Sequence, residues 1–507
     1  MERVDAVVVG SGPNGLAAAI ALARAGRSVL VLEAQPRLGG GVATDELTLP
    51  GFAHDVFSAV YPAAAASPVF SRMPLAEHGL TWVQPEVSMA HPMPDGTAGA
   101  LHRDLALTAG SLDALCPGDG RAWARFATPY LDAFGPLRKV LLGGFPPVVP
   151  ALRLLAAIGL DQVLELARLL LLPADAFARE TFSGPHATAW IFGSVFHGDQ
   201  PPTTPGSAIT GVYLHLLGHA VGWPSPRGGA GALTDALVGY LRSLGGRTRT
   251  DARVERIVGA HGRLAGVVTA GGDRVRADIV IVDVPPHALS RLAGDLLPGG
   301  YRDRLERFRY GPNTVKVDWA LDGPVPWTAD AARRAGTVHV AGPPEEMVLA
   351  HRQLGAGELP ERPFVLFGQQ SVADPTRAPE GAHTGWAYTR APSGVDWRLH
   401  ADAHVDRMEA QVERFAPGFR DRVLARHVMT PGDLERRNES LVGGDVGGGS
   451  YALDQIIFRP VPSLLPYRTP LRGLYLGSAS AFPGGAVHGV PGNAAARYAL
   501  TESRLRG

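Results

Sequence analysis

Apolar residues near the N-terminus follow the order of a strand, a helix and a second strand. The β-branched run Val7–Val9 meets the glycine-rich segment Gly10–Gly15 without a polar spacer, so the first strand ends there. Leu16–Ala25 supplies good helix formers with an apolar face, and Gly26 stops this helix before the apolar run Ser28–Leu32. The pattern predicts a βαβ unit with a tight glycine turn after its first strand.

Further elements follow the same periodicities along the chain. Alternation over Val315–Leu321 predicts a strand with Val315, Val317 and Trp319 on one face and Lys316 and Asp318 on the other. Other predicted helices cover Arg121–Val140, Ala151–Leu172, Leu233–Leu244 and Ala403–Phe415, and other predicted strands cover Arg253–Val258, Asp278–Val282, Phe364–Phe367 and Gly473–Gly477.

The glycine turn has the spacing of a dinucleotide-binding site. Gly10 permits a tight turn, Gly12 lets the backbone approach a pyrophosphate, and Gly15 lets helix and strand pack closely. Glu33 closes the second strand, where a carboxylate accepts hydrogen bonds from the hydroxyls of an adenosine ribose. No second glycine fingerprint exists, because prolines precede the candidate at 228–233 and do not form the central strand that such a unit requires.

A second glycine turn decides between dinucleotides. Gly39–Gly41 with Thr44 resembles the pattern of FAD enzymes of the glutathione reductase superfamily, although Gly41 stands where most relatives have a basic residue. The resemblance implies an α/β fold: a discontinuous Rossmann-like FAD-binding domain with an inserted α+β substrate domain. We expect FAD-binding segments at 1–75, 225–295 and 441–507, and substrate-domain segments at 76–224 and 296–440.

Composition removes several other classes of protein. The chain has 507 residues, a formal net charge of zero and 45% apolar residues, so it lacks the basic surface that nucleic-acid binding requires. Cys116 is the only cysteine, which excludes an intramolecular disulfide and a dithiol relay to a flavin. The first strand begins within a few residues of Met1, so we expect a cytoplasmic protein without a leader.

The most apolar helical stretch, Val148–Leu172, admits two interpretations. Asp161, Glu165 and Arg168 share one helical face and leave the other face apolar. One interpretation is a helix packed over the substrate domain. The other is contact with a membrane surface, giving a membrane-peripheral protein, or with an apolar substrate tunnel.

Nearly the whole chain resembles the phytoene desaturase and carotenoid isomerase group of FAD enzymes, and most closely the branch that contains pyridine nucleotide-disulfide oxidoreductase domain-containing protein 2. The motifs that carry this resemblance, besides the N-terminal one, are Gly51–Phe57, Arg227–Leu233, Gln370–Pro375, Ala378–His383, Leu453–Gln455, Arg459–Pro462 and the glycine-rich segment Phe482–Asn493.

The glycine motifs and the resemblance together imply one set of FAD contacts. In the family, the final strand and its glycines close over the ribityl chain and the flavin ring. The expected cofactor-binding residues are Gly10, Ser11, Gly12, Pro13, Asn14, Gly15, Glu33, Ala34, Gly39, Gly40, Gly41, Val42, Val254, Gly477, Ser478, Val490 and Asn493.

The candidate catalytic residues are His488, His54 and Lys316. The imidazole of His488 lies in the segment expected against the flavin, where it can accept a proton near neutral pH, or it is a structural histidine held by hydrogen bonds. His54, together with Asp55, either faces the cofactor pocket or forms hydrogen bonds with backbone amides. Lys316 either holds a water at the flavin, as a strand lysine does in related amine oxidases, or pairs with Asp318.

We expect no metal site. His215 and His219 are spaced like two ligands on one helix, but no third ligand is evident.

Three functions remain open. The first is a redox enzyme that dehydrogenates or oxidises a hydrophobic small molecule by hydride transfer to flavin N5, with quinone or dioxygen as the electron acceptor because no nicotinamide site is visible. The second is redox-neutral isomerisation or amine oxidation. The third is an FAD-binding interaction protein with little turnover. The identity of the substrate is not set by the sequence.

Overall fold

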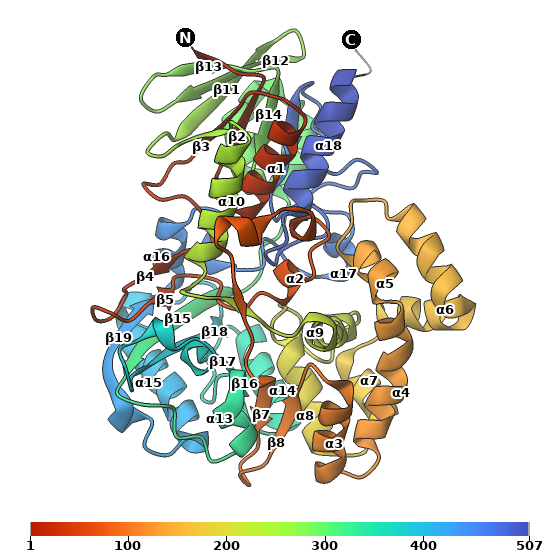
Figure 1. Ribbon diagram of the computed structural model, residues 1–507, viewed down its shortest axis with the longest axis vertical. Coiled ribbons are helices and arrows are strands. Elements are labelled where there is room, and N and C mark those ends of the chain that lie inside the picture. The colour runs from red at the N-terminus through yellow and green to blue at the C-terminus, as the bar shows by residue number, and fades with distance from the viewer. Residues whose placement is uncertain (1, 505–507) are drawn as a thin grey trace.

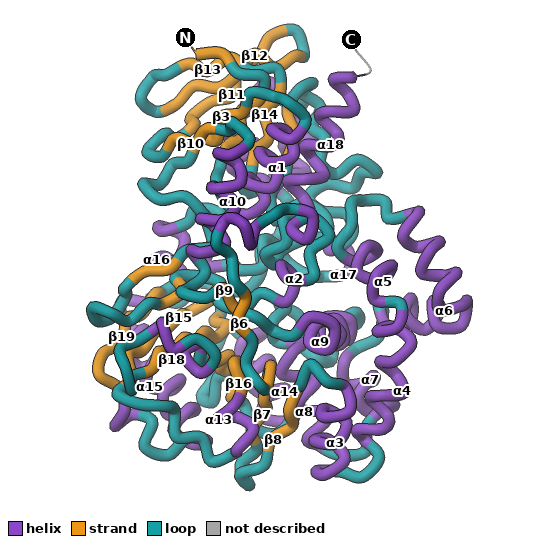
Figure 2. Tube along the Cα trace, viewed as in Figure 1, coloured by secondary structure: helices purple, strands orange, loops and turns teal. Residues whose placement is uncertain are grey.

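The computed structural model describes residues 2–504. Figure 1 shows two bodies, with the N- and C-termini both at the end of the upper one. Figure 2 shows strands concentrated in the upper body and at the lower left, and helices at the lower right. The chain passes between the two bodies several times, because elements from the beginning, middle and end of the sequence lie in each.

The upper body is built on a five-stranded parallel sheet with the order β10-β3-β2-β14-β20. Its strands are β10 (Arg247–Arg249), β3 (Val29–Leu32), β2 (Ala6–Val9), β14 (Ile279–Val282) and β20 (Leu474–Leu476). Both faces are covered, so the central strands are apolar throughout, as buried parallel strands must be. Strands from three distant stretches of the chain therefore form one sheet.

Alternate residues of this sheet enter two separate cores. Val8 and Val31 pack with α1 (Pro13–Arg24), α10 (Gly231–Ser243) and α18 (Val490–Arg504) on one side. Val7 and Val282 pack on the other side with α11 (Pro286–Ala293) and a second sheet. That sheet has the order β1-β13-β12-β11, from β1 (Glu2–Arg3), β13 (Arg274–Arg276), β12 (Arg263–Thr269) and β11 (Val254–Ala260).

The lower body contains a seven-stranded mixed sheet with the order β19-β15-β18-β17-β16-β7-β8. Its strands are β19 (Val423–Met429), β15 (Asn313–Leu321), β18 (His383–Ala391), β17 (Val365–Gly368), β16 (Ala335–Val340), β7 (Val87–Pro92) and β8 (Ala98–Leu101). Val315, Val317 and Trp319 pack into an apolar core with α15 (Trp397–Phe415). Lys316 and Asp318 lie on the opposite face, which confirms the predicted division of this strand.

Helices cover the remaining side of the lower body (Figure 1). They include α3 (Leu105–Leu115), α4 (Asp119–Asp132), α5 (Phe134–Leu141), α6 (Val148–Leu169), α7 (Ala174–Thr181), α8 (Pro185–Val195), α9 (Ala208–Val221) and α14 (Pro344–Gly355). The other helices are α2 (Pro62–Ala65), α12 (Gly299–Glu306), α13 (Asp330–Arg334), α16 (Pro431–Arg437) and α17 (Leu453–Ile456). The remaining strands, each of two residues, are β4 (Thr44–Asp45), β5 (His54–Asp55), β6 (Trp82–Val83) and β9 (Ser225–Pro226).

Two predicted helices have breaks that periodicity did not reveal. The stretch 121–140 is divided into α4 and α5 at Ala133, whose ψ of 23° leaves the helical range. Within α6, Gly159 has φ 80° and ψ 170°, so two helical halves meet at a kink. Only glycine adopts this conformation without strain.

Candidate functional site

One large cavity, with a volume of about 1260 Å³, extends from the glycine turn of the upper body to the seven-stranded sheet of the lower body. At one end it is lined by the turn between β2 and α1 and by the residues that follow β3 and β14. In the middle it is lined by Phe482, Pro483 and residues 485–488, and at the far end by residues of β15, β17 and β18. The carboxyl ends of parallel strands thus open onto this cavity, as is usual for ligand sites of such sheets.

Close backbone packing explains the first glycine turn. Gly10 has φ 97°, which side chains rarely allow. A Cβ on Gly15 would lie 2.2 Å from the carbonyl oxygen of Gly10, so only glycine lets α1 begin this close to β2. A Cβ on Gly40 would lie 3.0 Å from Cα of Gly12, which places the second glycine turn directly against the first.

Glu33 joins these turns through its carboxylate. Its Oε2 accepts hydrogen bonds from the backbone N of Ser11 (2.9 Å) and from Ser11 Oγ (2.6 Å), and its Oε1 accepts one from the backbone N of Gln35 (2.9 Å). The Ser11 hydroxyl in turn accepts a hydrogen bond from the backbone N of Gly39 at 3.0 Å. This network fixes the acid at the edge of the cavity.

The cavity contains most, but not all, of the residues expected to contact FAD. Those that line it are Gly10, Ser11, Gly12, Pro13, Asn14, Glu33, Ala34, Gly40, Gly41 and Val254. Those that do not line it are Gly15, Gly39, Val42, Gly477, Ser478, Val490 and Asn493. Gly15 packs on the backbone of Gly10, and Gly39 packs on Val42 and Thr234. In the C-terminal segment, other residues than the four named above line the cavity.

The C-terminal wall of the cavity is formed by other residues than those expected. Ala479 and residues 482–488 supply the lining there, except Gly484. Val490 is instead the first residue of α18. A Cβ on Gly492 would lie 1.8 Å from the backbone oxygen of Asn14, so Gly492 packs directly against α1. The glycines of this segment therefore hold α18 against α1, while the preceding loop faces the cavity.

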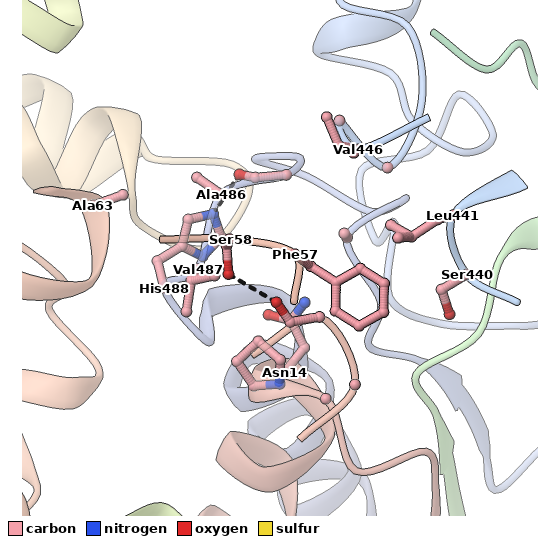
Figure 3. A pocket seen from close by; sticks show the side chains of 18 of the residues that line it. Asn14, Phe57, Ser58, Ala63, Ser440, Leu441, Val446, Ala486, Val487 and His488 are labelled. Atoms are coloured by element: carbon pink, nitrogen blue, oxygen red, sulfur yellow. Dashed lines mark hydrogen bonds between the residues drawn. The ribbon is translucent and has the colours of Figure 1, made fainter. Parts of the chain in front are cut away.

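These residues fit an FAD molecule. The two glycine turns, which together form a glycine cradle, leave no room for side chains where a pyrophosphate needs backbone amides. Glu33 lines the cavity beside them and offers a carboxylate as acceptor for a ribose. Val254 lines the same cavity, which continues past Asn14 and Ser58 toward His488 (Figure 3). The flavin ring would accordingly lie near residues 485–488.

His488 lines the cavity, but its ring is held by the backbone. Nε2 lies 3.1 Å from the oxygen of Gly485, and Nδ1 accepts a hydrogen bond from the backbone N of Val490 at 3.2 Å. Burial lowers the pKa of His488 to about 4. With both ring nitrogens engaged, its position agrees with the structural alternative rather than with a catalytic base.

Lys316 lines the cavity from β15 and forms a buried ion pair with Asp318. Burial lowers the pKa of Lys316, and burial raises the pKa of Asp318 to about 6, since the low-dielectric surroundings disfavour both charges. The interpretation of Lys316 as a partner of Asp318 therefore holds, and the same residue also lines the cavity.

His54 lies outside the cavity, behind Lys316. Its Nε2 is 2.7 Å from Thr48 Oγ1, and its Nδ1 is 3.7 Å from Asp318 Oδ1. Burial, together with the charges of Lys316 and Arg377, lowers the pKa of His54 to about 3. The expected contact of His54 with the cofactor pocket is not made, so a catalytic role for this residue has no geometric support.

Asp55 is likewise a structural residue. It forms a buried ion pair with Arg377, and its Oδ1 accepts hydrogen bonds from the Thr44 hydroxyl and from the backbone N of Ala230. This cluster connects the second glycine turn to the start of α10. Hydrogen bonding to backbone amides was one of the two alternatives that the sequence left for His54 and Asp55, and the contact of Asp55 with the amide of Ala230 agrees with it.

The far end of the cavity is mainly apolar, with a few polar groups. Trp223, Leu366 and Trp386 line it, and Tyr388 and His197 add a hydroxyl and an imidazole. Arg390 lies 5.4 Å from the Tyr388 ring centroid, behind this wall. Such a lining suits a largely apolar ligand.

His215 and His219, the spaced pair on α9, each have a protein partner. His215 Nε2 bonds to Ser194 Oγ at 2.7 Å, and His219 Nε2 accepts a hydrogen bond from Trp123 Nε1 at 2.9 Å. Among residues 2–504, no group of three side chains has the arrangement of metal ligands.

Sequence reasoning missed one acid in the nucleotide end of the cavity. Asp283 follows β14, and its Oδ2 accepts a hydrogen bond from the backbone N of Gly15 at 2.8 Å. The two residues are 268 positions apart, so no local pattern connects them. The only available signal was an acid directly after a predicted parallel strand.

The chain matches known proteins in family and in sequence. The profile described as "Flavin containing amine oxidoreductase" matches residues 14–495. The rat protein "Pyridine nucleotide-disulfide oxidoreductase domain-containing protein 2" is 30% identical, with 98% of this chain and 93% of the rat protein covered. A limonene dehydrogenase polypeptide of Castellaniella defragrans is 25% identical (96% and 92% covered), and the neurosporene-forming phytoene desaturase of Rhodobacter capsulatus is 24% identical (96% and 92% covered).

Solved structures show the same fold. An oxidoreductase from Methanosarcina mazei superposes with a TM-score of 0.64 at 18% identity, covering 98% of this chain and 100% of that one. Cyclohexylamine oxidase from Brevibacterium oxydans gives a TM-score of 0.59 at 17% identity, covering 99% and 100%. The fold class expected from the glycine motifs is confirmed.

Proposed function

Because the chain belongs to the family of flavin-containing amine oxidoreductases, its cofactor is FAD, and we propose that it dehydrogenates an apolar small molecule. The family match covers nearly the whole chain, which supports an oxidoreductase. Relatives named as limonene dehydrogenase and phytoene desaturase support removal of hydrogen from a hydrocarbon-like substrate. The identity of that substrate goes beyond these similarities.

The observation that carries this proposal is that a single cavity contains both a dinucleotide cradle and an apolar wall. The glycine turn and Glu33 form one end, and Leu366, Trp386 and Tyr388 form the other. A substrate bound against that wall shares its cavity with the flavin. No domain movement is needed to bring the two together.

The protein's part in the reaction is to bind, orient and exclude water. Bound FAD supplies the hydride acceptor, at flavin N5. The apolar wall holds the substrate carbon in place and keeps the site dry, while Phe57 and Leu441 add apolar surface near the middle of the cavity (Figure 3). Orientation of this kind is the main contribution that a flavin enzyme of this class requires.

Lys316 is the side chain best placed to handle a proton. It lines the cavity, its pKa is lowered by burial, and it forms a buried ion pair with Asp318. A buried pair of this kind can hold a proton on Nζ or release it toward the carboxylate at modest cost. We assign Lys316 this role, with Asp318 and His54 as the groups that position it.

For the electron acceptor we propose a quinone or dioxygen. Residues 2–504 contain one parallel five-stranded sheet, and its glycine-cornered turn is the one already described. The described part of the chain therefore shows no second Rossmann unit that would receive a nicotinamide dinucleotide.

Amine oxidation is less well supported by the substrate end of the cavity. An aromatic cage for an amine needs open ring faces. The Trp386 and Tyr388 rings are perpendicular, at 83° with centroids 5.5 Å apart, and the Arg390 guanidinium already lies 5.4 Å from the Tyr388 ring. A second cation at this wall would be repelled, which favours a neutral substrate.

We also propose peripheral contact with a lipid surface through α6. The exposed apolar residues of this region are Val148, Val149, Leu152, Leu155, Leu160, Leu164 and Leu171. Ala167, Leu170 and Leu171 of the same region line the cavity, so one segment presents apolar surface both outward and to the site. No helix within residues 2–504 is long and apolar enough to cross a membrane, so the contact would be superficial.

The test is an anaerobic reductive titration of the purified holoprotein with neutral polyenes and terpenes, amines and alcohols. Loss of the visible flavin absorption with a neutral apolar compound supports dehydrogenation, whereas loss with amines alone supports amine oxidation. An isomerase would act only after chemical reduction of its flavin and would leave that flavin reduced. A protein whose flavin responds to no donor and, once photoreduced, reacts with neither dioxygen nor quinone fits an FAD-binding interaction protein.

A further inference from the structure

Asp283 lies at the carboxyl edge of the parallel sheet, beside the glycine turn. Its backbone N donates a hydrogen bond to the oxygen of Val9 at 2.7 Å, which continues the pairing of β14 with β2 by one residue. Strand β2 ends just before Gly10, so the side chain of Asp283 is held where the turn into α1 begins. The residue lines the nucleotide end of the cavity.

The carboxyl group of Asp283 reaches the amides at the start of α1. Oδ2 accepts a hydrogen bond from the backbone N of Gly15 at 2.8 Å. A Cβ on Gly12 would lie 2.7 Å from the same oxygen, so the absence of a side chain at Gly12 leaves the space that this carboxyl group occupies. The carboxyl group thus lies against Gly12 and Gly15, and the backbone oxygen of Asp283 lies against Gly10, the third glycine of the fingerprint.

The charges around Asp283 do not neutralise it. Glu33, which follows β3, adds a negative charge that acts on Asp283, and no arginine or lysine forms an ion pair with Asp283 among residues 2–504. On the elements packed around this end, Arg253 is paired with Glu439, while His287 and Arg291 lie on α11. Burial and Glu33 raise the pKa of Asp283 to about 7, against the lowering effect of the Gly15 hydrogen bond.

A pyrophosphate needs the same helix terminus that this carboxyl group contacts. An ionised Asp283 would place a third negative charge, besides those of two phosphates, against these amides. A protonated Asp283 can keep its bond from Gly15 and also donate a hydrogen bond to a phosphate oxygen. The geometry is favourable for binding only in the second state.

We propose that Asp283 is a cofactor-binding residue of this chain and that it binds the pyrophosphate of FAD in its protonated form. The proposal rests on the position assigned to FAD in the cavity, but not on the reaction proposed for the enzyme. It assigns the carbonyl oxygen of the acid to Gly15 and the hydroxyl to the phosphate. Binding of FAD then takes up a proton from solvent whenever the free site is ionised.

The test measures FAD affinity of the apoprotein by quenching of FAD fluorescence at about pH 7.5 and about pH 8.5. We expect the FAD affinity of the unaltered chain to fall about tenfold between these two pH values, because each ionised site must gain a proton on binding. This window lies above the titration of His287, whose pKa is lowered by burial. Asp283→Asn, whose amide donates without titrating, should bind FAD with equal affinity at both values.

Asp278→Asn is the matched control, because the Asp278 side chain is 80% exposed and lies five positions earlier. It should keep the tenfold fall. Equal affinity of the unaltered chain at both pH values would overturn the proposal, and so would a tenfold fall that persists in Asp283→Asn.

A measurement on the unaltered chain covers the case in which Asp283→Asn does not fold. ADP, which carries the pyrophosphate, should lose affinity over the same pH unit, whereas adenosine should not. Loss of affinity for both, or for neither, would contradict a role at the phosphate. Binding of FAD without pH dependence overturns this proposal alone, while a chain that binds no FAD at either pH overturns the cofactor site itself.

Discussion

Lys316 and Asp318, two residues apart on β15, form an ion pair in which both side chains are buried, at 3% and 0% exposure. Successive residues of a strand alternate between its faces, so these two necessarily point the same way. That face is the one turned to the cavity, whereas Val315, Val317 and Trp319 fill the apolar core behind it. Burying a charged pair costs desolvation free energy. Because this pair lies beside the cavity, we attribute its retention to function rather than to stability.

Breaking this pair should affect both stability and reaction. Lys316→Met leaves the Asp318 carboxylate without its partner, and we expect a loss of about 3–5 kcal/mol in the free energy of unfolding near neutral pH. The loss should shrink as the pH falls and Asp318 becomes protonated, and this should begin above pH 6, because Lys316 no longer lowers the pKa of Asp318. Denaturant titration at several pH values measures it.

The double variant Lys316→Met with Asp318→Leu is the control, because it removes both charges and leaves no buried ion. It should recover most of the stability but not the rate of flavin reduction. Recovery of both would show that the lysine has no part in the reaction.

Buried histidines should make the protein sensitive to acid. Burial lowers the pKa of His488, His91 and His351 to about 4 in the folded chain, from an ordinary value of 6.5. Between these values the unfolded chain binds protons that the folded chain does not, so stability is full above about pH 6.5 and falls below it. At about pH 5 each such histidine should cost about 2 kcal/mol.

Thermal unfolding from about pH 8 to about pH 5 measures this effect. His488→Asn should make the profile less steep, because one of these buried histidines is removed, whereas substitution of the exposed His400 should leave it unchanged. A melting temperature that stays constant over this range would contradict the account of these residues as buried and neutral.

The glycine cradle should tolerate no side chain. Gly15→Ala places a Cβ 2.2 Å from the oxygen of Gly10, so the start of α1 must move away from the sheet. We expect loss of most bound FAD and a lower melting temperature. Gly300→Ala, in α12 with open space around its Cβ, should retain its flavin, and the flavin-to-protein absorbance ratio compares the two.

Lipid contact through α6 should depend on its outward leucines. Leu152, Leu160 and Leu164 are 61%, 61% and 57% exposed, and their combined replacement by serine should abolish flotation of the protein with liposomes. The control replaces three exposed leucines elsewhere, Leu107, Leu349 and Leu399, in the same way. Equal flotation of the two triple variants would show that α6 is not the contact.

Local features of the site could be predicted from the sequence, and distant ones could not. Gly10, Gly12 and Glu33 line the cavity, because the first βαβ unit that places them is specified by neighbouring residues. Lys316 was placed correctly because strand alternation is a local rule. The fold class followed from the same motifs.

Other parts of the site depend on packing between distant segments, which no local pattern reveals. Gly477, Ser478, Val490 and Asn493 lie outside the cavity lining, because α18 packs directly on α1 and only the loop before it faces inward. His54 was expected near the cofactor from its position in the chain, yet the ion pair on β15 separates it from the cavity. Asp283 was missed because its partner Gly15 is 268 residues away.

The most direct test of the central claim is anaerobic mixing of the FAD-loaded protein with a neutral apolar polyene or terpene, followed through the visible flavin absorption. The account predicts bleaching by at least one such compound, a dehydrogenated product in equal amount, and return of the colour when a quinone or dioxygen is added. Flavin that stays oxidised with every neutral compound but bleaches with an amine would contradict it.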